Sequence, residues 1–422
     1  MRGIIEGFYG PPWSWADRHD IGASLAAAGM DTYVYAPKDD PLHRHRWREP
    51  YDAVVLGALE SLVGSGGLRV GFSVSPGLSI DTASADDRAA LLAKFRQTLD
   101  VGVTLVGLLL DDLSPVEGLG ERHAELARWL RAELDADVEL FLVPTHYTGT
   151  DRTPYLDALA RRVPPEVAIG WTGMQVVNRS VTSAQAQAWS AVMDGRRPLL
   201  WDNTPVNDAL MSDRLYTGPL RGRDPDLPDH LAGYLANPMV QPRASLPPLL
   251  SAAAWLRGDD PVAAWSASLG AARVLAEGCD GEHPAALAVR ALGADGTAVV
   301  DEAAAEELDA WLAAASQCDD GGWGEDVAPW VEQLRAEAGV ARTALQVVRG
   351  DEEEARSLAP LLLLTWPSAR SLRTAVLGGR GGVVPGLAQR ADGEWSARAG
   401  SYVAPDSLTD RLVEAAFRRV GG

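Results

Sequence analysis

The sequence contains few cysteines and no long apolar run, and both absences restrict what the protein can be. Its only cysteines are Cys279 and Cys318, which are too few for a disulfide framework and lack the spacing of a zinc site. We therefore expect two thiols and no metal. The longest strongly apolar run, residues 358–366, is far shorter than the ~20 residues that cross a bilayer, so we expect no membrane association.

Positive charge is also scarce, and this argues against a polyanionic partner. Lysine and arginine total 38 and aspartate and glutamate total 58, which gives a formal net charge of −20. Such a chain repels the phosphates that a nucleic-acid-binding protein must hold, so we expect no nucleic-acid partner. The N-terminus runs into a strand-like segment without the basic and apolar regions of a secretory signal. These features favour a cytoplasmic location.

What the sequence does contain is a repeated pattern of strands and helices. In residues 1–240 an apolar run, a polar or glycine-rich cluster and a helical stretch recur, and several runs are apolar on both faces, as in a parallel sheet covered by helices. The expected strands are residues 3–6, 32–36, 69–74, 105–110, 138–143, 167–171, 198–201 and 231–235. Helical periodicity separates them, for example at residues 21–28, 51–63, 86–101, 121–134 and 183–192.

Eight such repeats predict a (β/α)8 TIM-type barrel. A doubly wound sheet is the alternative, but the glycine fingerprint of a dinucleotide fold is missing after the first strand, where residues 7–10 read GFYG. Beyond residue 242 the composition shifts to alanine, leucine, glutamate and arginine, with helical periodicity at residues 261–277, 301–315, 327–348 and 408–420 and glycine-containing loops at 278–281, 318–322 and 378–382. We expect a catalytic barrel over residues 1–245 and an all-α helical domain over residues 246–422.

Residues that could carry chemistry collect directly after the predicted strands. In a barrel these positions converge on one face. They are rich in carboxylates, amides and aromatic rings, a mixture that suits sugars because amides and carboxylates pair with hydroxyl groups while rings stack on the pyranose. The segments are residues 7–10, 37–40, 111–112, 144–147, 171–173, 201–203 with 207–208, and 237–238.

Among these, Asp111 and Asp112 stand out because an apolar strand delivers two successive carboxyl groups at its end. Such a pair can work as an acid beside an ionised partner. Capping of the following helix is the alternative, and the residues alone leave it open. Asp39 and Asp40 resemble a turn with a surface ion pair, and residues 42–47, which include His43 and His45, resemble a solvated basic loop without a third metal ligand.

Taken together, the segments resemble glycoside hydrolase family 84, the β-N-acetylglucosaminidases that include the protein O-GlcNAc hydrolases. The resemblance covers about the first 245 residues and consists of several motifs in order. They read GIIEGFYG (3–10) with PWS (12–14), TYVYAPKDDP (32–41), DD (111–112), PTHY (144–147), WTG (171–173), WDN (201–203) with VND (206–208), and NPM (237–239).

This resemblance implies retaining hydrolysis in which the 2-acetamido oxygen of the substrate attacks the anomeric carbon and forms an oxazoline. Asp111 would orient the acetamide nitrogen, and Asp112 would protonate the leaving oxygen and then deprotonate water. This differs from the scheme in which an enzyme carboxylate is the nucleophile. Gly7, Lys38, Asn203, Asp208 and Asn237 would hold the sugar hydroxyls, with Tyr147 near the acetamido oxygen and Trp201 lining the pocket. Tyr9 and Trp171 complete the expected binding set.

The hypothesis is therefore an exo-acting β-N-acetylglucosaminidase that needs no cofactor and removes terminal GlcNAc from a glycoprotein or a glycoside. Two alternatives remain, a GlcNAc-binding protein without turnover and a hyaluronidase-type enzyme, although a net charge of −20 opposes a polyanionic substrate. The sequence does not identify the aglycone. The helical region is similar in placement to the domain that follows the barrel in this family, and it is the expected surface of a homodimer.

Overall fold

The computed structural model describes residues 1–114, 116–292, 298–370, 377, 387–389, 395–397 and 408–421. The chain forms two compact units. The barrel unit consists of Met1–Ala209 and Pro219–Trp265, and the helical unit consists of Leu210–Gly218 and Ser266–Gly422. The expected boundary at residue 245 falls inside helix α7 (Pro242–Arg257), and the barrel unit continues to Trp265.

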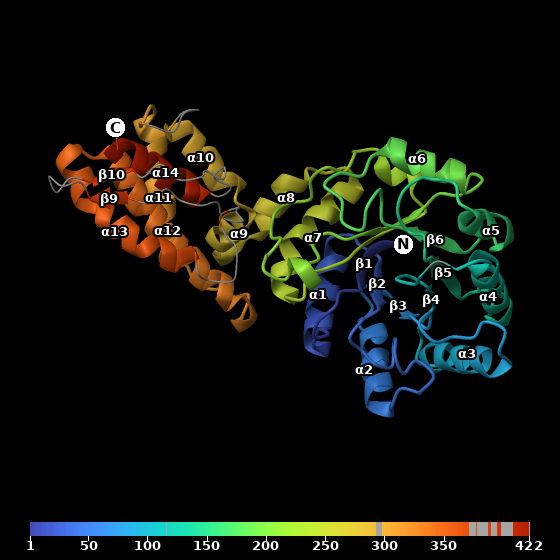
Figure 1. Cartoon of the computed structure of the whole chain (residues 1–422). Coiled ribbons are helices and arrows are strands. Elements are labelled where there is room, and N and C mark those ends of the chain that lie inside the picture. The colour runs from blue at the N-terminus through green and yellow to red at the C-terminus, as the bar shows by residue number, and fades with distance from the viewer. Residues whose placement is uncertain are drawn as a thin grey trace. The chain divides into compact units, whose positions relative to one another are not determined.

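The predicted (β/α)8 barrel is confirmed. Eight parallel strands follow one another around a closed sheet, which β8 completes by pairing with β1, where Gly3 lies opposite Leu235 (Figure 1). The strands are β1 (Arg2–Glu6), β2 (Thr32–Tyr35), β3 (Arg69–Val74), β4 (Leu105–Leu109), β5 (Glu139–Val143), β6 (Ala168–Trp171), β7 (Leu199–Asp202) and β8 (Gly233–Ala236). Each overlaps a predicted apolar run, because a strand enclosed by helices and by the barrel interior must be apolar on both faces.

Helices cover the outside of this barrel. They are α1 (Trp15–Ala27), α2 (Ala53–Gly64), α3 (Ala85–Leu99), α4 (Leu119–Glu133), α5 (Pro154–Arg162), α6 (Ser183–Val192) and α7 (Figure 1). Several begin at a side-chain cap, such as Thr182, which forms a reciprocal capping box with Gln185 at the start of α6. The interior is filled by side chains from successive strands, including Ile5, Leu109 and Phe141. The packed interior therefore fixes the strand ends, and with them the positions at which the following loops begin.

The helical unit contains α9 (Arg273–Asp280), α10 (Glu282–Leu292), α11 (Glu302–Ala315), α12 (Ala328–Arg349), α13 (Glu352–Arg370) and α14 (Leu408–Gly421). The predicted helix at residues 261–277 is wrong as a single element. Helix α8 (Pro261–Ser268) ends first, because Gly270 takes a φ of +49° before α9 begins. The predicted loop at residues 278–281 starts late, since α9 runs to Asp280, and the loop at residues 378–382 lies outside the described residues.

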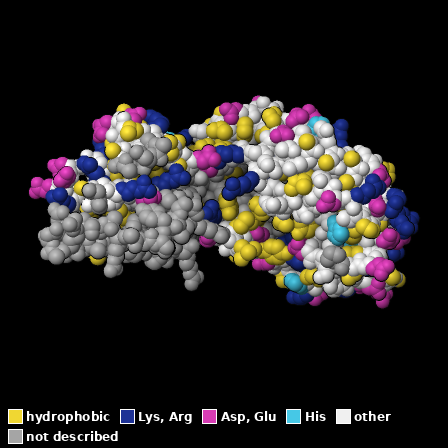
Figure 2. Space-filling model, turned by 45° about the horizontal axis from the view of Figure 1, so that its top comes forward, with side chains coloured by type: hydrophobic (Ala, Val, Ile, Leu, Met, Phe, Trp, Pro, Cys, Tyr) yellow, Lys and Arg dark blue, Asp and Glu magenta, His cyan; other side chains and the backbone are white. Residues whose placement is uncertain are grey.

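Two further features concern the described helices and the surface of the barrel unit. No helix in the described part of the chain has both the length and the apolar composition needed to cross a membrane. On the face drawn in Figure 2, acidic and basic side chains of the barrel unit are interspersed rather than separated by sign. The acidic side chains of this unit therefore do not form one separate patch on that face.

Candidate active site

The two neighbouring aspartates after β4 have different surroundings. Asp111 forms a buried ion pair with Lys38, which follows β2, and the distance from Lys38 Nζ to Asp111 Oδ2 is 2.6 Å. The Asp111 side chain is 10% exposed and that of Lys38 is 3% exposed. The second carboxylate oxygen, Asp111 Oδ1, is buried and accepts no hydrogen bond from the described residues. Since buried polar atoms are nearly always hydrogen-bonded, this oxygen is available to a donor from a ligand.

Asp112 is more open, with 34% of its side chain exposed. Its backbone is left-handed, with a φ of +57°, a conformation that aspartate tolerates better than most residues. The hydroxyl of Tyr9 donates to Asp112 Oδ2 at 2.8 Å, and the hydroxyl of Tyr147 donates to Asp112 Oδ1 at 3.0 Å. Neither aspartate caps the next helix, because α4 begins after Gly118. The capping alternative is therefore wrong.

The hydroxyls of Tyr9 and Tyr147 remain protonated at neutral pH and act as hydrogen-bond donors. Burial raises the pKa of the Tyr9 hydroxyl to about 12, and the nearby Asp112 carboxylate adds to this effect. Burial, followed by the charge of Asp112, also raises the pKa of Tyr147 well above its ordinary value. A neutral phenol donates a hydrogen bond to a carboxylate, so the two rings fix both oxygens of Asp112 from opposite loops.

Arg44, which was expected to lie in a solvated basic loop, contacts both Tyr9 and Asp112. Arg44 Nη1 donates to the Tyr9 hydroxyl, and Arg44 Nη2 lies 3.9 Å from Asp112 Oδ2. The expectation of a solvated loop is wrong for Arg44 and His43, which are buried because the loop returns to β3, where Ser75 N donates to His43 O at 2.9 Å. Burial lowers the pKa of His43 to about 3. The sequence feature that could have indicated a place for Arg44 at the site is its position shortly after Lys38, in the segment that follows β2.

Residues after β1, β7 and β8 contact one another and form a further part of the site. Gly7 N donates to Asn237 Oδ1 at 3.2 Å, and Tyr9 N donates to Asp208 Oδ2 at 2.8 Å. Glycine at position 7 leaves room for the Trp201 ring, since a Cβ there would lie 2.4 Å from a ring atom and one of the two would have to shift. Burial raises the pKa of Asp208 above its ordinary value. The loops that carry the expected sugar ligands are thus tied directly to one another.

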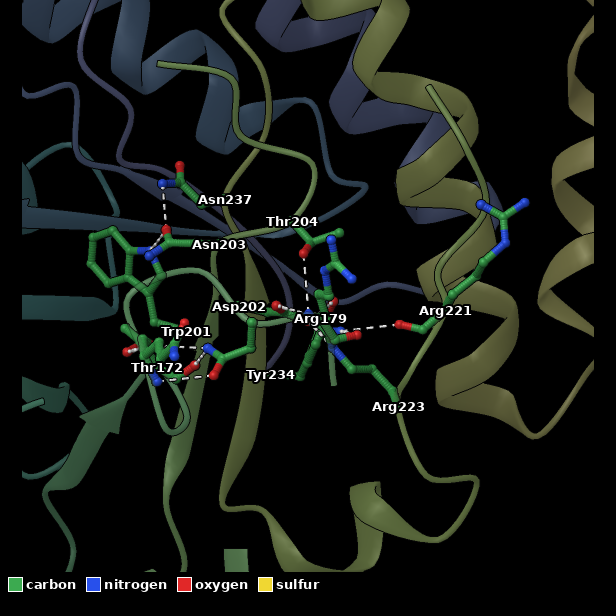
Figure 3. A network of polar contacts seen from close by, with 12 residues as sticks. Thr172, Arg179, Trp201, Asp202, Asn203, Thr204, Arg221, Arg223, Tyr234 and Asn237 are labelled. Carbon is green, nitrogen blue, oxygen red and sulfur yellow. Dashed lines mark hydrogen bonds and ion pairs between the residues drawn. The ribbon is translucent and has the colours of Figure 1, made fainter. Parts of the chain in front are cut away.

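Asn203 connects the residues at the ends of β7 and β8. As Figure 3 shows, its Oδ1 accepts hydrogen bonds from both Trp201 Nε1 and Asn237 Nδ2, each at 2.9 Å. Its Nδ2 donates to Val176 O at 2.8 Å, which links the loop after β6 to the same cluster. Lys38 Nζ lies 5.7 Å from the centroid of the Trp201 ring. This places the ring beside the Lys38–Asp111 pair.

A buried ion pair that the sequence did not indicate lies next to this cluster. Arg223 Nε and Nη2 donate to the two carboxylate oxygens of Asp202 at 2.9 and 2.6 Å, and the Tyr234 hydroxyl donates to Asp202 Oδ2 (Figure 3). Asp202 stands between Trp201 and Asn203, and its backbone oxygen accepts from Asn237 N at 2.8 Å. The pair therefore fixes the strand end from which the site residues project.

Other candidates lie outside the cluster. Trp171 is fully buried, its Nε1 donates to Gly149 O at 2.9 Å, and its ring packs near Trp189, so it has no surface to offer a ligand. Asp40 accepts from the hydroxyls of Tyr35 and Tyr51, which makes it part of the packing under the loop. Among the described residues, no group of three or more His, Cys, Asp or Glu side chains is arranged to hold a metal ion.

Several known proteins are similar to this chain in sequence or in fold. A family model described as beta-N-acetylglucosaminidase matches residues 2–289. The chain is 28% identical over 278 residues to the protein O-GlcNAcases of Rattus norvegicus and Mus musculus, a match that covers 61% of this chain and 30% of each relative. The chain thus spans less than a third of the length of these curated relatives.

Solved structures give a match over a larger part of the chain. A mutant of the Thermobaculum terrenum O-GlcNAc hydrolase superposes with a TM-score of 0.75 and 27% identity, covering 89% of this chain and 91% of that one. The protein CpGH84B superposes with a TM-score of 0.77 over 89% of this chain and 74% of its own. At 23% identity, this second match is evidence for the fold alone.

Proposed function

The chain belongs to the β-N-acetylglucosaminidase family, glycoside hydrolase family 84, and we propose that it is an exo-acting, retaining β-N-acetylglucosaminidase. The observation that carries the proposal is the environment of the Asp111–Asp112 pair. Asp111 is held by Lys38 and has one buried oxygen that accepts no hydrogen bond from the described residues, while Asp112 is partly exposed and lies between two tyrosine hydroxyls. One carboxylate is suited to binding a donor group of the substrate and the other to exchanging a proton with it.

In the first step the acetamido oxygen of the substrate forms a bond to the anomeric carbon, and the bond from that carbon to the aglycone oxygen breaks. Asp112 gives its proton to the departing oxygen. Asp111 Oδ1 accepts a hydrogen bond from the acetamide N–H and so stabilises the positive charge that develops on the oxazoline ring. The negative charge of Asp111 is fixed in place by Lys38 at 2.6 Å, so little reorganisation is needed.

In the second step water attacks the anomeric carbon on the face that the aglycone left. Asp112, now ionised, takes the proton of that water, and the bond to the acetamido oxygen breaks. Two inversions restore the β configuration. Retaining enzymes that supply their own nucleophile place two carboxyl groups about 5–5.5 Å apart across the sugar. Asp111 and Asp112 are consecutive residues after one strand, an arrangement that instead suits a nucleophile carried by the substrate.

The sugar hydroxyls are assigned to Gly7, Lys38, Asn203, Asp208 and Asn237, the acetamido oxygen to Tyr147, and one wall of the pocket to Trp201. Support comes from the hydrogen bonds that already connect the loops carrying these groups. Tyr9 is assigned to Asp112 rather than to the sugar, since its hydroxyl bonds that carboxylate. The aglycone is proposed to be Ser or Thr of a protein, because relatives of this chain are named protein O-GlcNAcase and O-GlcNAc hydrolase.

The test is hydrolysis of 4-nitrophenyl β-GlcNAc, followed by proton NMR of the sugar released. The proposal expects release of 4-nitrophenol and β-GlcNAc as the first anomer formed. A folded protein that releases no 4-nitrophenol would contradict the activity, and initial formation of α-GlcNAc would contradict retention. A second assay compares an O-GlcNAc-modified Ser peptide with a GlcNAc-terminated oligosaccharide. Preference for the oligosaccharide would contradict the proposed aglycone but would not affect the proposed mechanism of hydrolysis.

A further inference from the structure

Arg44 has contacts that differ from those of the structural arginines in this chain. Arg131 and Arg196 each donate to several backbone carbonyls and so stabilise turns. The polar contacts of Arg44 instead go to the Tyr9 hydroxyl and to the Asp112 carboxylate. Its guanidinium also lies 5.4 Å from the centroid of the Tyr9 ring. Its side chain is 10% exposed, so these contacts are shielded from bulk water.

The contact between Arg44 and Tyr9 fixes the direction of a second hydrogen bond. An arginine side chain has no acceptor, so the Tyr9 oxygen must accept from Arg44 Nη1. The single proton of the Tyr9 hydroxyl is then directed to Asp112 Oδ2 at 2.8 Å. Arg44 thereby makes Tyr9 a donor to the carboxylate, while its own charge lies 3.9 Å from the same oxygen.

We propose that Arg44 is a positioning residue of the hydrolysis, which acts through Tyr9 to hold the Asp112 carboxyl where it meets the leaving oxygen and the attacking water. This inference rests on the proposed function. It gives the loop after β2 a second residue with a role in the reaction, in addition to Lys38. The backbone of Tyr9 is anchored independently, because its N–H donates to Asp208 Oδ2. Loss of Arg44 should therefore release the hydroxyl end of Tyr9 without displacing its main chain.

The test measures kcat/KM of Arg44→Met on aryl β-GlcNAc substrates that differ in leaving group. A residue that positions the proton donor matters most when the leaving group needs a proton. We expect a loss of about 10- to 100-fold on the phenyl glycoside, the range of a hydrogen bond to a charged group, and a much smaller loss on the 2,4-dinitrophenyl glycoside. Arg44→Lys, which keeps the charge and one donor, should recover part of the loss.

Two further variants separate this role from a structural one. Arg46→Met removes an arginine from the same loop whose side chain is exposed and paired with Glu49, and it should retain wild-type kinetics on both substrates. Because Arg44 acts through Tyr9, the double variant Tyr9→Phe/Arg44→Met should lose little more than the more impaired single variant. Independent losses that multiply would contradict that link.

The inference is overturned if Arg44→Met loses the same factor on both glycosides or retains full activity on both. If Arg44→Met does not fold, as judged by circular dichroism, Arg44→Lys and Tyr9→Phe give the same comparison, and an equal loss on both glycosides again overturns it. If the wild-type protein hydrolyses neither glycoside, the proposed function fails and this inference fails with it. Activity of the wild type on both substrates thus distinguishes the two failures.

Discussion

Replacement of Gly7 by alanine tests how tightly the loops of the site fit together. A Cβ at this position would lie 2.4 Å from Cζ2 and 2.7 Å from Cη2 of Trp201. Ordinary contacts between carbon atoms are about 3.5–4.0 Å, so the indole ring or the β1 loop must move by roughly 1 Å. The ring has little room for this, since it is 6% exposed and its Nε1 donates to Asn203.

The shift is transmitted to two assigned sugar ligands, because Asn203 bonds both Trp201 and Asn237. A displacement of about 1 Å at a site can cost about 100-fold in rate, and we expect a loss of that order in kcat/KM for 4-nitrophenyl β-GlcNAc. Overpacking should also lower the free energy of unfolding by about 1–3 kcal/mol, measured by urea denaturation.

The matched control is Gly57→Ala in α2, where a Cβ meets no atom within 4 Å. It should leave kinetics unchanged and stabilise the protein by about 0.5–1 kcal/mol. Because Trp201→Phe removes the ring atoms that clash, Gly7→Ala/Trp201→Phe should be less impaired than the product of the two single losses. Wild-type activity of Gly7→Ala, or strictly multiplicative losses in the double variant, would refute the reasoning.

Three further changes probe other parts of the account. Asp112→Asn should lose about 10²- to 10⁴-fold in kcat/KM on poor leaving groups and less on activated ones, and a uniform loss would argue against its role as the acid. Lys38→Met should lower the free energy of unfolding by about 3–5 kcal/mol because it leaves Asp111 charged and unpaired, and Asp111→Asn in the same chain should restore part of it. His43 has a folded-state pKa of about 3 against an ordinary value of 6.5, so its contribution to stability is present above pH 6.5 and is lost as the pH falls towards 3. His43→Asn should flatten urea-measured stability against pH in that window, and an unchanged slope would contradict this.

The sequence predicted the strands of the barrel well, for a physical reason. A strand such as Leu105–Leu109 is buried on both faces, so its apolar run is visible without any partner. The same reasoning located Asp111, Asp112, Lys38 and Asn237, because strand ends converge in this architecture. The prediction of one helix over residues 261–277 was wrong because the break at Gly270 depends on backbone conformation, which hydrophobic periodicity does not reveal.

The sequence did not predict which residues of different loops contact one another. Trp171 and Trp201 both lie at strand ends. Trp171 is fully buried, whereas Trp201 contacts Gly7 and donates a hydrogen bond to Asn203. The Asp202–Arg223 pair joins residues whose association depends on how the loop before β8 folds back. Arg44 carries a charge in a basic segment that was expected to be solvated, and only the return of that segment to β3 brings it to Tyr9.

The central claim is that the substrate's own acetamido oxygen is the nucleophile, guided by Asp111. The most direct measurement is kcat/KM for 4-nitrophenyl glycosides whose N-acetyl group carries zero, one, two or three fluorine atoms. Fluorine withdraws electrons from the carbonyl oxygen and weakens it as a nucleophile. The account predicts a steep, continuous fall in kcat/KM across the series. A rate that does not depend on fluorine content would show that the acetamide takes no part and would contradict the claim.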